Sequence, residues 1–153
     1  MIEWQWAAYS DLDRDCLFEI LYARQAVFIV EQDCPYQDID HLDSLSWHLI
    51  GWSQDAGEKE LAAYMRVTIP GEKYPEPSIG RVITTQKARG RGLGNQLMLE
   101  GIARIEAEYP NTPIRISAQV YLQKYYRRFG FENVGEPYEE DGIPHIEMLR
   151  KAS

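Results

Sequence analysis

The hydrophobic pattern at the start of the chain predicts a strand followed by a long helix. Ile2–Ala7 alternates apolar and polar positions and carries two tryptophans, as expected for a strand. Ser10 and Asp13 have the spacing of a capping box, which predicts that the helix starts there. The helix should end near Glu31, because Pro35 disfavours helix in the residues just before it. Its predicted inner face repeats at three- and four-residue steps, at Leu17, Ile20, Leu21, Arg24, Val27 and Phe28.

The middle of the chain predicts a loop, a hairpin and a second loop. Cys34–Ser46 is polar and acid-rich, which favours a loop with at most one short helical turn. Trp47–Trp52 and Leu61–Ile69 predict two strands, and a turn at Gln54–Gly57 joins them into a hairpin. The three prolines and the glycine of Pro70–Pro77 predict the second loop.

The second half alternates strands and helices. Its predicted elements are a strand at Ser78–Thr85, a glycine-rich turn at Arg89–Gly94, a helix from Leu93 to about Tyr109, a strand at Ile114–Gln119, a short helix at Tyr121–Arg128, and strands at Phe131–Val134 and Pro144–Leu149. A polar loop around Glu139–Gly142 should join the last two strands. The predicted order is β-α-β-β-β-α-β-α-β-β with no internal repeat or linker. We therefore expect one mixed α/β domain over residues 1–153.

Composition and charge limit the function classes. The net charge of −8 and the lack of a basic stripe argue against nucleic acid as a main partner. No apolar run approaches the roughly 20 residues of a membrane span, so no membrane partner is expected. The first residues lack the pattern of a signal peptide. Cys16 and Cys34 are too few for a disulfide scaffold, so we expect free thiols and a cytoplasmic protein.

The glycine turn, Arg89–Gly94, is the strongest local signal of chemistry. Its sequence is RGRGLG, and it lies between a predicted strand and a predicted helix. Glycines let backbone amides approach a ligand, and a helix start presents unpaired N–H groups, so the turn predicts a phosphate site. Arg89 and Arg91 add positive charge. The turn lacks the Lys-Ser/Thr of a Walker loop, and Asn95 stands where a Rossmann fingerprint has its third glycine.

The glycine turn matches Arg/Gln-x-x-Gly-x-Gly/Ala, with Arg89, Gly92 and Gly94 at the fixed places. This resembles the pyrophosphate-binding signature of the GCN5-related N-acetyltransferase (GNAT) superfamily. A second motif of that superfamily, Tyr-x-x-x-Gly-Phe, is similar to the segment that begins at Tyr126. The resemblance implies an α/β fold with a central, mostly antiparallel sheet that is splayed between its fourth and fifth strands.

The resemblance also implies acetyl-CoA as co-substrate, no metal, and an amine acceptor on a small molecule or peptide. The implied cofactor-binding residues are Val82, Ile83, Thr84, Arg89, Gly90, Arg91, Gly92, Leu93, Gly94 and Gln119, where the family often has Asn in place of Gln119. Tyr126 matches the family's proton donor to the departing thiolate. By chemistry the general base stays open among Glu31, Asp38, Asp40, Asp43, His48, Glu139, Asp141 and His145, of which Glu31 and His145 are carried forward.

Two further blocks, Arg24–Asp43 and Tyr138–Met148, resemble the ElaA-type acetyltransferases within this superfamily. The first block is also similar to the acyl-homoserine-lactone synthases, which take their acyl group from a carrier protein and use S-adenosylmethionine as acceptor. Both resemblances favour substrate binding by Arg24, Asp40, Asp43 and Arg66. The acids of this block lack the spacing and the glycine of an EF-hand, so we expect no metal there.

Several function classes therefore stay open. An acetyl-CoA-dependent N-acetyltransferase that works by direct transfer is the main hypothesis, and an acyl-homoserine-lactone-synthase-like acyltransferase is the alternative enzyme. A coenzyme-A-binding domain without turnover and a pure interaction module are the non-catalytic alternatives. Homodimers are common in the GNAT fold, but the sequence carries no decisive interface signal.

Overall fold

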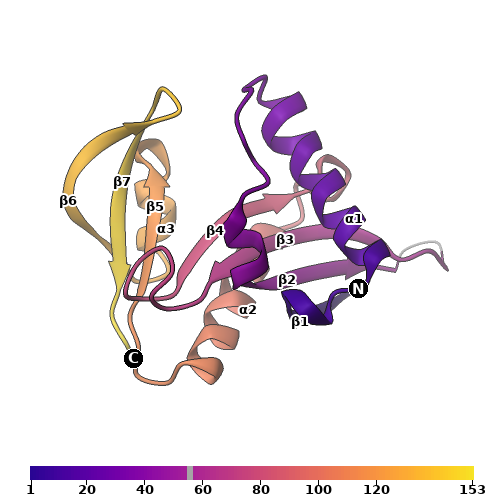
Figure 1. Cartoon of the computed structure of the whole chain (residues 1–153), viewed down its shortest axis with the longest axis horizontal. Coiled ribbons are helices and arrows are strands. Elements are labelled where there is room, and N and C mark those ends of the chain that lie inside the picture. The colour runs from indigo at the N-terminus through magenta and orange to yellow at the C-terminus, as the bar shows by residue number, and fades with distance from the viewer. Residues whose placement is uncertain (55–56) are drawn as a thin grey trace.

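The chain folds around one seven-stranded sheet with the order β1-β2-β3-β4-β5-β7-β6 (Figure 1). The computed structural model describes residues 1–54 and 57–153. The strands are β1 Ile2–Ala8, β2 Ser46–Ser53, β3 Glu60–Thr68, β4 Ser78–Thr84, β5 Ile114–Gln119, β6 Phe131–Glu140 and β7 Ile143–Arg150, and the α-helices are α1 Arg14–Arg24, α2 Leu93–Glu108 and α3 Gln123–Arg127. The predicted element order and the β2–β3 hairpin are confirmed. Residues 55 and 56 of the turn predicted at Gln54–Gly57 lie outside the described residues.

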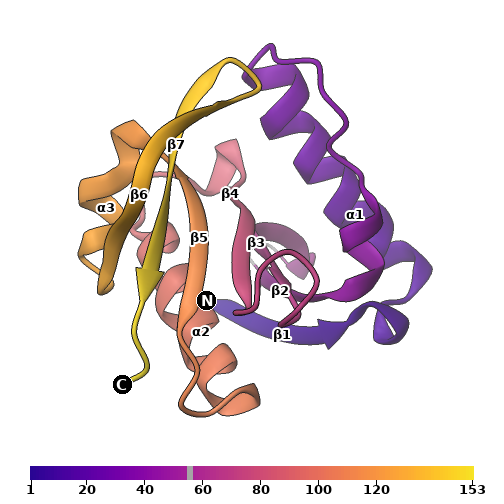
Figure 2. The same ribbon diagram turned by 60° about the vertical axis from the view of Figure 1, so that its left-hand side comes forward.

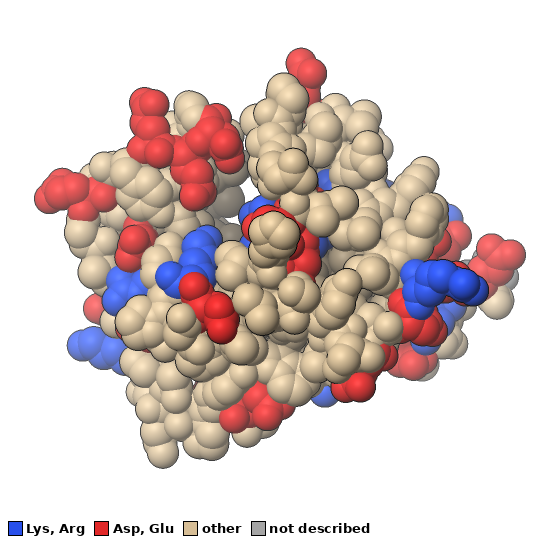
Figure 3. All heavy atoms as spheres, in the orientation of Figure 1, with Lys and Arg blue, Asp and Glu red and all other residues tan. Residues whose placement is uncertain are grey.

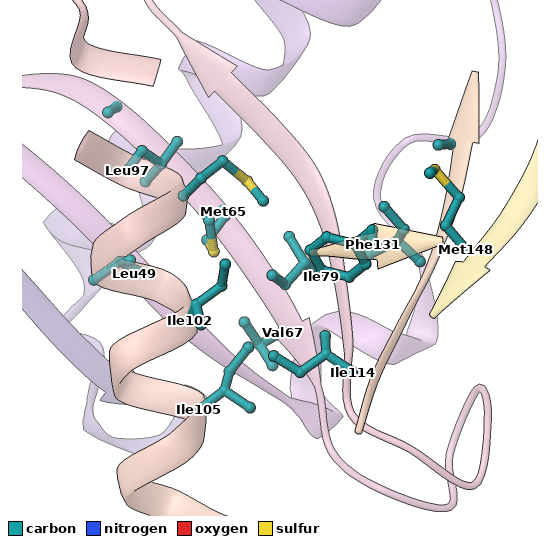
Figure 4. Close-up of a cluster of buried hydrophobic side chains, with 14 of the residues drawn as sticks. Leu49, Met65, Val67, Ile79, Leu97, Ile102, Ile105, Ile114, Phe131 and Met148 are labelled. Atoms are coloured by element: carbon teal, nitrogen blue, oxygen red, sulfur yellow. The ribbon is translucent and has the colours of Figure 1, made fainter. Parts of the chain in front are cut away.

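Helices cover both faces of the sheet, with α1 on one side and α2 on the other (Figure 2). Neighbouring strand residues point to opposite faces. On β2, Ile50 accordingly packs in the cluster under α1, whereas Leu49 packs in the larger cluster under α2. Figure 4 shows that larger cluster, in which Met65 of β3 meets Leu97 and Ile102 of α2. The central strands therefore read as nearly continuous apolar runs because both of their faces are covered.

The sheet is splayed in its middle. All neighbouring strands pair antiparallel except β4 and β5, which are parallel and share one residue pair, Ser78 with Arg115. Beyond that pair the strands diverge, and within the described chain Ile79–Thr84 has no partner on β5. The expected splay between the fourth and fifth strands is thus confirmed. It leaves backbone N–H and C=O groups of β4 facing a gap.

The first helical segment differs from its prediction at both ends. Asp13, not Ser10, caps α1, because its carboxylate accepts a hydrogen bond from Cys16 N at 2.7 Å, so the capping box predicted at Ser10 was wrong. The segment does end at Glu31, but Gln25–Glu31 is a π-helix. Its wider turns show in the bond from Gln32 N to the Val27 carbonyl at 3.2 Å. A π-turn is rare and often marks a functional site.

The last hairpin is longer than its hydrophobic pattern predicts. β6 was expected to end at Val134 but continues to Glu140, so the joining loop shrinks to Asp141 and Gly142. The register of β6 shifts between Val134 and Tyr138, where Gly135 takes a φ of 80°. A bulge of this kind breaks the alternation that sequence analysis relies on.

Candidate functional site

A cavity of about 240 Å³ opens where β4 and β5 separate, and we call it the β4–β5 cleft. Its walls come from the π-helical segment, β4, β5, α3 and the β6–β7 hairpin. Four residues predicted to bind cofactor or to act in catalysis line it together: Val82, Gln119, Tyr126 and His145. These residues are far apart in the sequence, and the splay of the sheet brings them to one place.

Tyr126 stands on α3 with its ring packed edge-on against Tyr125 and Phe131. Burial raises the pKa of its hydroxyl to about 12. Deprotonation would leave a phenolate in a poorly solvated site, so the hydroxyl keeps its proton at neutral pH. Tyr126 therefore lines the cleft with its hydroxyl in the protonated form.

His145 faces Gln119 across the β5–β7 ladder, and both line the cleft. His145 Nδ1 lies 2.7 Å from the carbonyl oxygen of Ile143. Since a carbonyl oxygen can only accept, Nδ1 carries the proton and Nε2 is the basic nitrogen of the neutral ring. Glu140 Oε2 lies 3.5 Å from that Nε2, so a protonated ring would gain a carboxylate partner.

Sequence analysis missed polar residues on the far wall of the cleft. Ser117 lines the cleft two residues before Gln119, on the same face of β5. Its hydroxyl is hydrogen-bonded to the hydroxyl of Tyr138, whose ring stacks on His145. The alternation of β5 could have revealed Ser117, but the partnership with Tyr138 depends on the β6–β7 register.

The glycine turn has the geometry of an anion site. Gly90 and Gly92 have φ angles of 85° and 73°, which L side chains rarely adopt. Gly92 is the N-cap of α2, and no side chain caps the helix. The first intrahelical bond runs from Gln96 N to the Gly92 carbonyl, so the amides before it point out of the helix. The positive end of the helix dipole then favours a negatively charged ligand.

Arg89, the first residue of the glycine turn, is paired with Glu31 at the end of the π-helical segment. The guanidinium binds the carboxylate through both terminal nitrogens, one of them at 2.8 Å. This hydrogen bond holds the pKa of Glu31 below its ordinary value. Glu31 does not belong to the described residues that line the cleft. The two candidate bases are therefore separated in the structure. His145 lines the cleft, whereas Glu31 lies at the glycine turn.

Behind the cleft, arginines and aspartates form a buried charge cluster made of Arg24, Asp38, Asp40, Asp43, Arg66 and Arg81. Arg24 is fully buried, and its guanidinium lies 3.0 Å from Asp38 Oδ2 and 2.6 Å from Asp43 Oδ1. Burial alone would raise the pKa of Asp43, but the hydrogen bonds and charge of Arg24 outweigh it and lower that pKa. The cluster ties α1 and the following loop to the sheet.

The same cluster reaches the cleft through β4. Arg66 lies 2.6 Å from Asp40 Oδ1, and Arg81 lies 2.8 Å from Asp38 Oδ1. Arg81 lines the cleft from a backbone with φ of 52°, beside a register shift in the β3–β4 ladder. Of the four predicted substrate-binding residues, Arg24, Asp43 and Arg66 are buried among one another, and Asp40 is partly exposed.

The other candidate bases lie in different settings. His48 is buried, with its ring 2.6 Å from the Tyr64 hydroxyl and 2.9 Å from the Asp43 carbonyl. Burial lowers the pKa of His48. Asp141 lines the mouth of the cleft in the β6–β7 turn. Figure 3 shows acidic side chains gathered over that hairpin tip, beside a hollow.

Two absences concern the described residues alone. In the ranges 1–54 and 57–153, no group of three or more His, Cys, Asp or Glu is arranged to hold a metal ion. Within those ranges, no helix has the length and apolarity required to span a membrane.

Sequence comparisons agree on one family. Residues 24–152 match the family described as the acetyltransferase (GNAT) domain. The chain is 45% identical to the UPF0039 protein sll0451 of Synechocystis over 148 residues, which cover 97% of this chain and 94% of that protein. It is 44% identical to Protein ElaA of Escherichia coli K12 over 153 residues, which cover 99% of this chain and 97% of that protein.

Solved structures give the same result. A crystal structure of an acyl-CoA N-acyltransferase from Pseudomonas aeruginosa is similar with a TM-score of 0.91 and 42% identity, covering 98% of this chain and 99% of that chain. The crystal structure of E. coli ElaA has a TM-score of 0.89 and 43% identity, covering 99% and 100%. A CoA-dependent acyl-homoserine lactone synthase shares the fold alone, at a TM-score of 0.77 and 12% identity, covering 100% and 84%.

Proposed function

Because the chain belongs to the GNAT acetyltransferase family and is therefore an acyltransferase, we propose that it moves an acetyl group from acetyl-CoA to an amine. The acceptor is the amine of a small molecule or a peptide. One observation carries the proposal. Tyr126, whose hydroxyl is protonated, lines the same cleft as the part of β4 that has no partner on β5. The two free cysteines agree with a cytoplasmic location.

The glycine turn and β4 would hold the acetyl donor. The amides at the start of α2, together with Arg89 and Arg91, would bind the pyrophosphate of CoA. The pantetheine arm would enter the cleft and bond to the open backbone of Val82–Thr84, in place of the β5 partner that this segment lacks. The Ile83 side chain is buried under α1, so its share is through the backbone. Gln119 faces the arm from the opposite strand.

In the transfer step, the amine nitrogen forms a bond to the acetyl carbon, and the bond from that carbon to sulfur breaks. A backbone N–H of β4 would stabilise the negative oxygen that develops on the acetyl group. The Tyr126 hydroxyl would give its proton to the departing sulfur, which needs one because a thiol has a pKa of about 8.5. The pKa of about 12 keeps that proton available at neutral pH.

The acceptor must first lose a proton, and His145 is the favoured base. It lines the cleft, and its Nδ1–H bond to Ile143 leaves Nε2 free to take the proton. Glu140 would then stabilise the cation that forms. Glu31, the other base carried forward, is engaged by Arg89, and its lowered pKa makes it a poor base.

We place the acceptor at the end of the cleft that Asp141 and Tyr36 line. Carboxylates at this end, Glu140 and Asp141, suit an ammonium group. Arg24, Asp40, Asp43 and Arg66 were predicted to bind the substrate. We propose that they do so indirectly, by holding this wall of the cleft in place. Arg81, which pairs with Asp40, is the member of the charge cluster that lines the cleft.

The proposal is tested by calorimetric titration of acetyl-CoA into the purified protein and into the Arg89→Ala variant. We expect saturable binding to the wild type and a clear loss of affinity in the variant, because a charge-assisted contact to the pyrophosphate is removed. Amine acceptors are then screened by thiol release.

Lys87→Ala is the matched control, since it removes a neighbouring exposed cation that pairs with Glu60. Its affinity should stay near that of the wild type. No binding of acetyl-CoA at millimolar concentration by the wild type would sink the proposal and favour a carrier-protein donor or an interaction module.

A further inference from the structure

The guanidinium of Arg89 is fully engaged within the chain. Both terminal nitrogens bind the Glu31 carboxylate, and Nε donates to the Thr84 carbonyl at 3.2 Å. The two-pronged contact is the geometry in which arginine also binds phosphate oxygens. The Glu31 carboxylate therefore stands in the position that an anionic ligand of Arg89 would take.

We propose that the Glu31 carboxylate competes with the pyrophosphate of CoA for Arg89. The return of Glu31 to Arg89 then promotes release of the product CoA. This inference rests on the proposed function. The pyrophosphate carries more charge than a carboxylate and also receives the backbone amides of the glycine turn, which Glu31 does not reach in the described contacts. The ligand can therefore displace Glu31, but at the expense of the ion pair.

The strength of the ion pair suits such a competitor. The Arg89 and Glu31 side chains are 38% and 36% exposed, so solvent and salt screen their attraction. Pairs of this kind change an equilibrium by about two- to fivefold. Glu31 should therefore weaken CoA binding moderately rather than block it.

The position of Glu31 also connects the donor site to the cleft. Glu31 is the last residue of the π-helical segment, and Phe28 within that segment and Gln32 just after it line the cleft. When CoA displaces Glu31, this end of the segment loses its tie to the glycine turn.

The test is the affinity of CoA for the Glu31→Gln variant, measured by calorimetry, together with the CoA dissociation rate. We expect the dissociation constant to fall by about two- to fivefold at low salt, with a slower dissociation rate, because Arg89 no longer has an internal carboxylate. The gain should shrink as salt is raised.

Glu60→Gln is the matched control, because it makes the same change of charge at an exposed carboxylate that pairs with Lys87 instead. In an Arg89→Ala background, Glu31→Gln should bring no gain, since the partner is already gone. Pantetheine, which lacks the pyrophosphate, should bind the wild type and Glu31→Gln equally.

Each outcome decides between the two claims. If Glu31→Gln binds CoA no tighter than Glu60→Gln does, the claim that Glu31 competes for Arg89 is wrong, while the proposed function stands. A gain that persists in the Arg89→Ala background would also overturn it. If wild-type protein binds no CoA, the inference and the proposed function both fall.

Discussion

Tyr126 is the residue at which binding and chemistry can be separated. We expect Tyr126→Phe to lower kcat by about a hundredfold or more, because the thiolate loses its positioned proton donor. The affinity for acetyl-CoA should stay unchanged, since the ring still packs against Phe131. Thiol release gives the rate, and calorimetry gives the affinity.

Tyr125→Phe is the control, because it removes the same atom from the neighbouring residue, which does not belong to the described lining of the cleft. Its kcat should match the wild type. Equal rates for Tyr126→Phe and the wild type would point to a water as proton donor. An absence of turnover in the wild type with every amine tested, despite CoA binding, would favour the non-catalytic domain.

At the scale of single residues, the sequence predicts several residues that line the cleft but not the contacts that their side chains make. The motif spacings lead to Tyr126 and Gln119, and both line the cleft. Nothing in the sequence indicates that Arg81 takes a positive φ and enters the wall, because a bulge is a property of strand pairing. The pairing of Glu31 with Arg89 joins residues 58 positions apart and depends on the whole fold.

At the scale of elements, the edge strand β1 is held by close packing against β2. A Cβ added at Gly51 would lie 2.7 Å from Cζ3 of Trp4, its cross-strand partner. Because an indole ring is rigid, β1 would have to move. We expect Gly51→Ala to lower the free energy of unfolding by about 1–3 kcal/mol, as overpacking does elsewhere, measured by urea denaturation.

Gly80→Ala is the matched control on β4, where an added Cβ meets nothing within 4 Å and φ lies outside the positive range. Its stability should equal or slightly exceed that of the wild type, because alanine restricts the unfolded chain. Equal losses in the two variants would contradict the role given to Trp4.

The sequence predicts elements better than their inner geometry. The end of the first helical segment at Glu31 was correct, since Pro35 acts locally. The π-helical turns before Glu31 could not be predicted, because the pattern of apolar residues there is the same as for an α-helix. The capping residue was placed three positions early, since Ser10 and Asp13 both have capping side chains and the chain uses the second.

At the scale of the whole molecule, the charge cluster links stability to pH. The lowered pKa of Asp43 adds stability that is fully present above the ordinary aspartate pKa of about 3.9 and is lost as pH falls through the folded value. Buried His48, whose pKa is also lowered, acts in the same direction as pH falls below about 6.5. We expect the free energy of unfolding to decline below about pH 6.5 and more steeply below pH 4.

Urea unfolding across this pH range measures the effect. Asp43→Asn should lose about 3–5 kcal/mol at neutral pH, because two buried cations, Arg24 and Arg66, each lose one of their carboxylate partners. Its acid dependence should be flatter. If that variant does not fold, Asp40→Asn at the partly exposed edge of the cluster gives a milder form of the same change. Wild-type stability that does not change between pH 5 and pH 3 would contradict this account.

The splay of the sheet also bears on how the chain avoids sticking to other polypeptides. An open strand edge is a template for a foreign strand and hence a risk for aggregation. Here the open edge of β4 lies inside a cavity of about 240 Å³, walled by Phe28 on one face of the sheet and Tyr126 on the other. A foreign strand would have to bring side chains into both walls, whereas a thin, unbranched arm would not. The gap into which we propose that the pantetheine arm enters therefore also keeps this strand edge from pairing with a foreign strand.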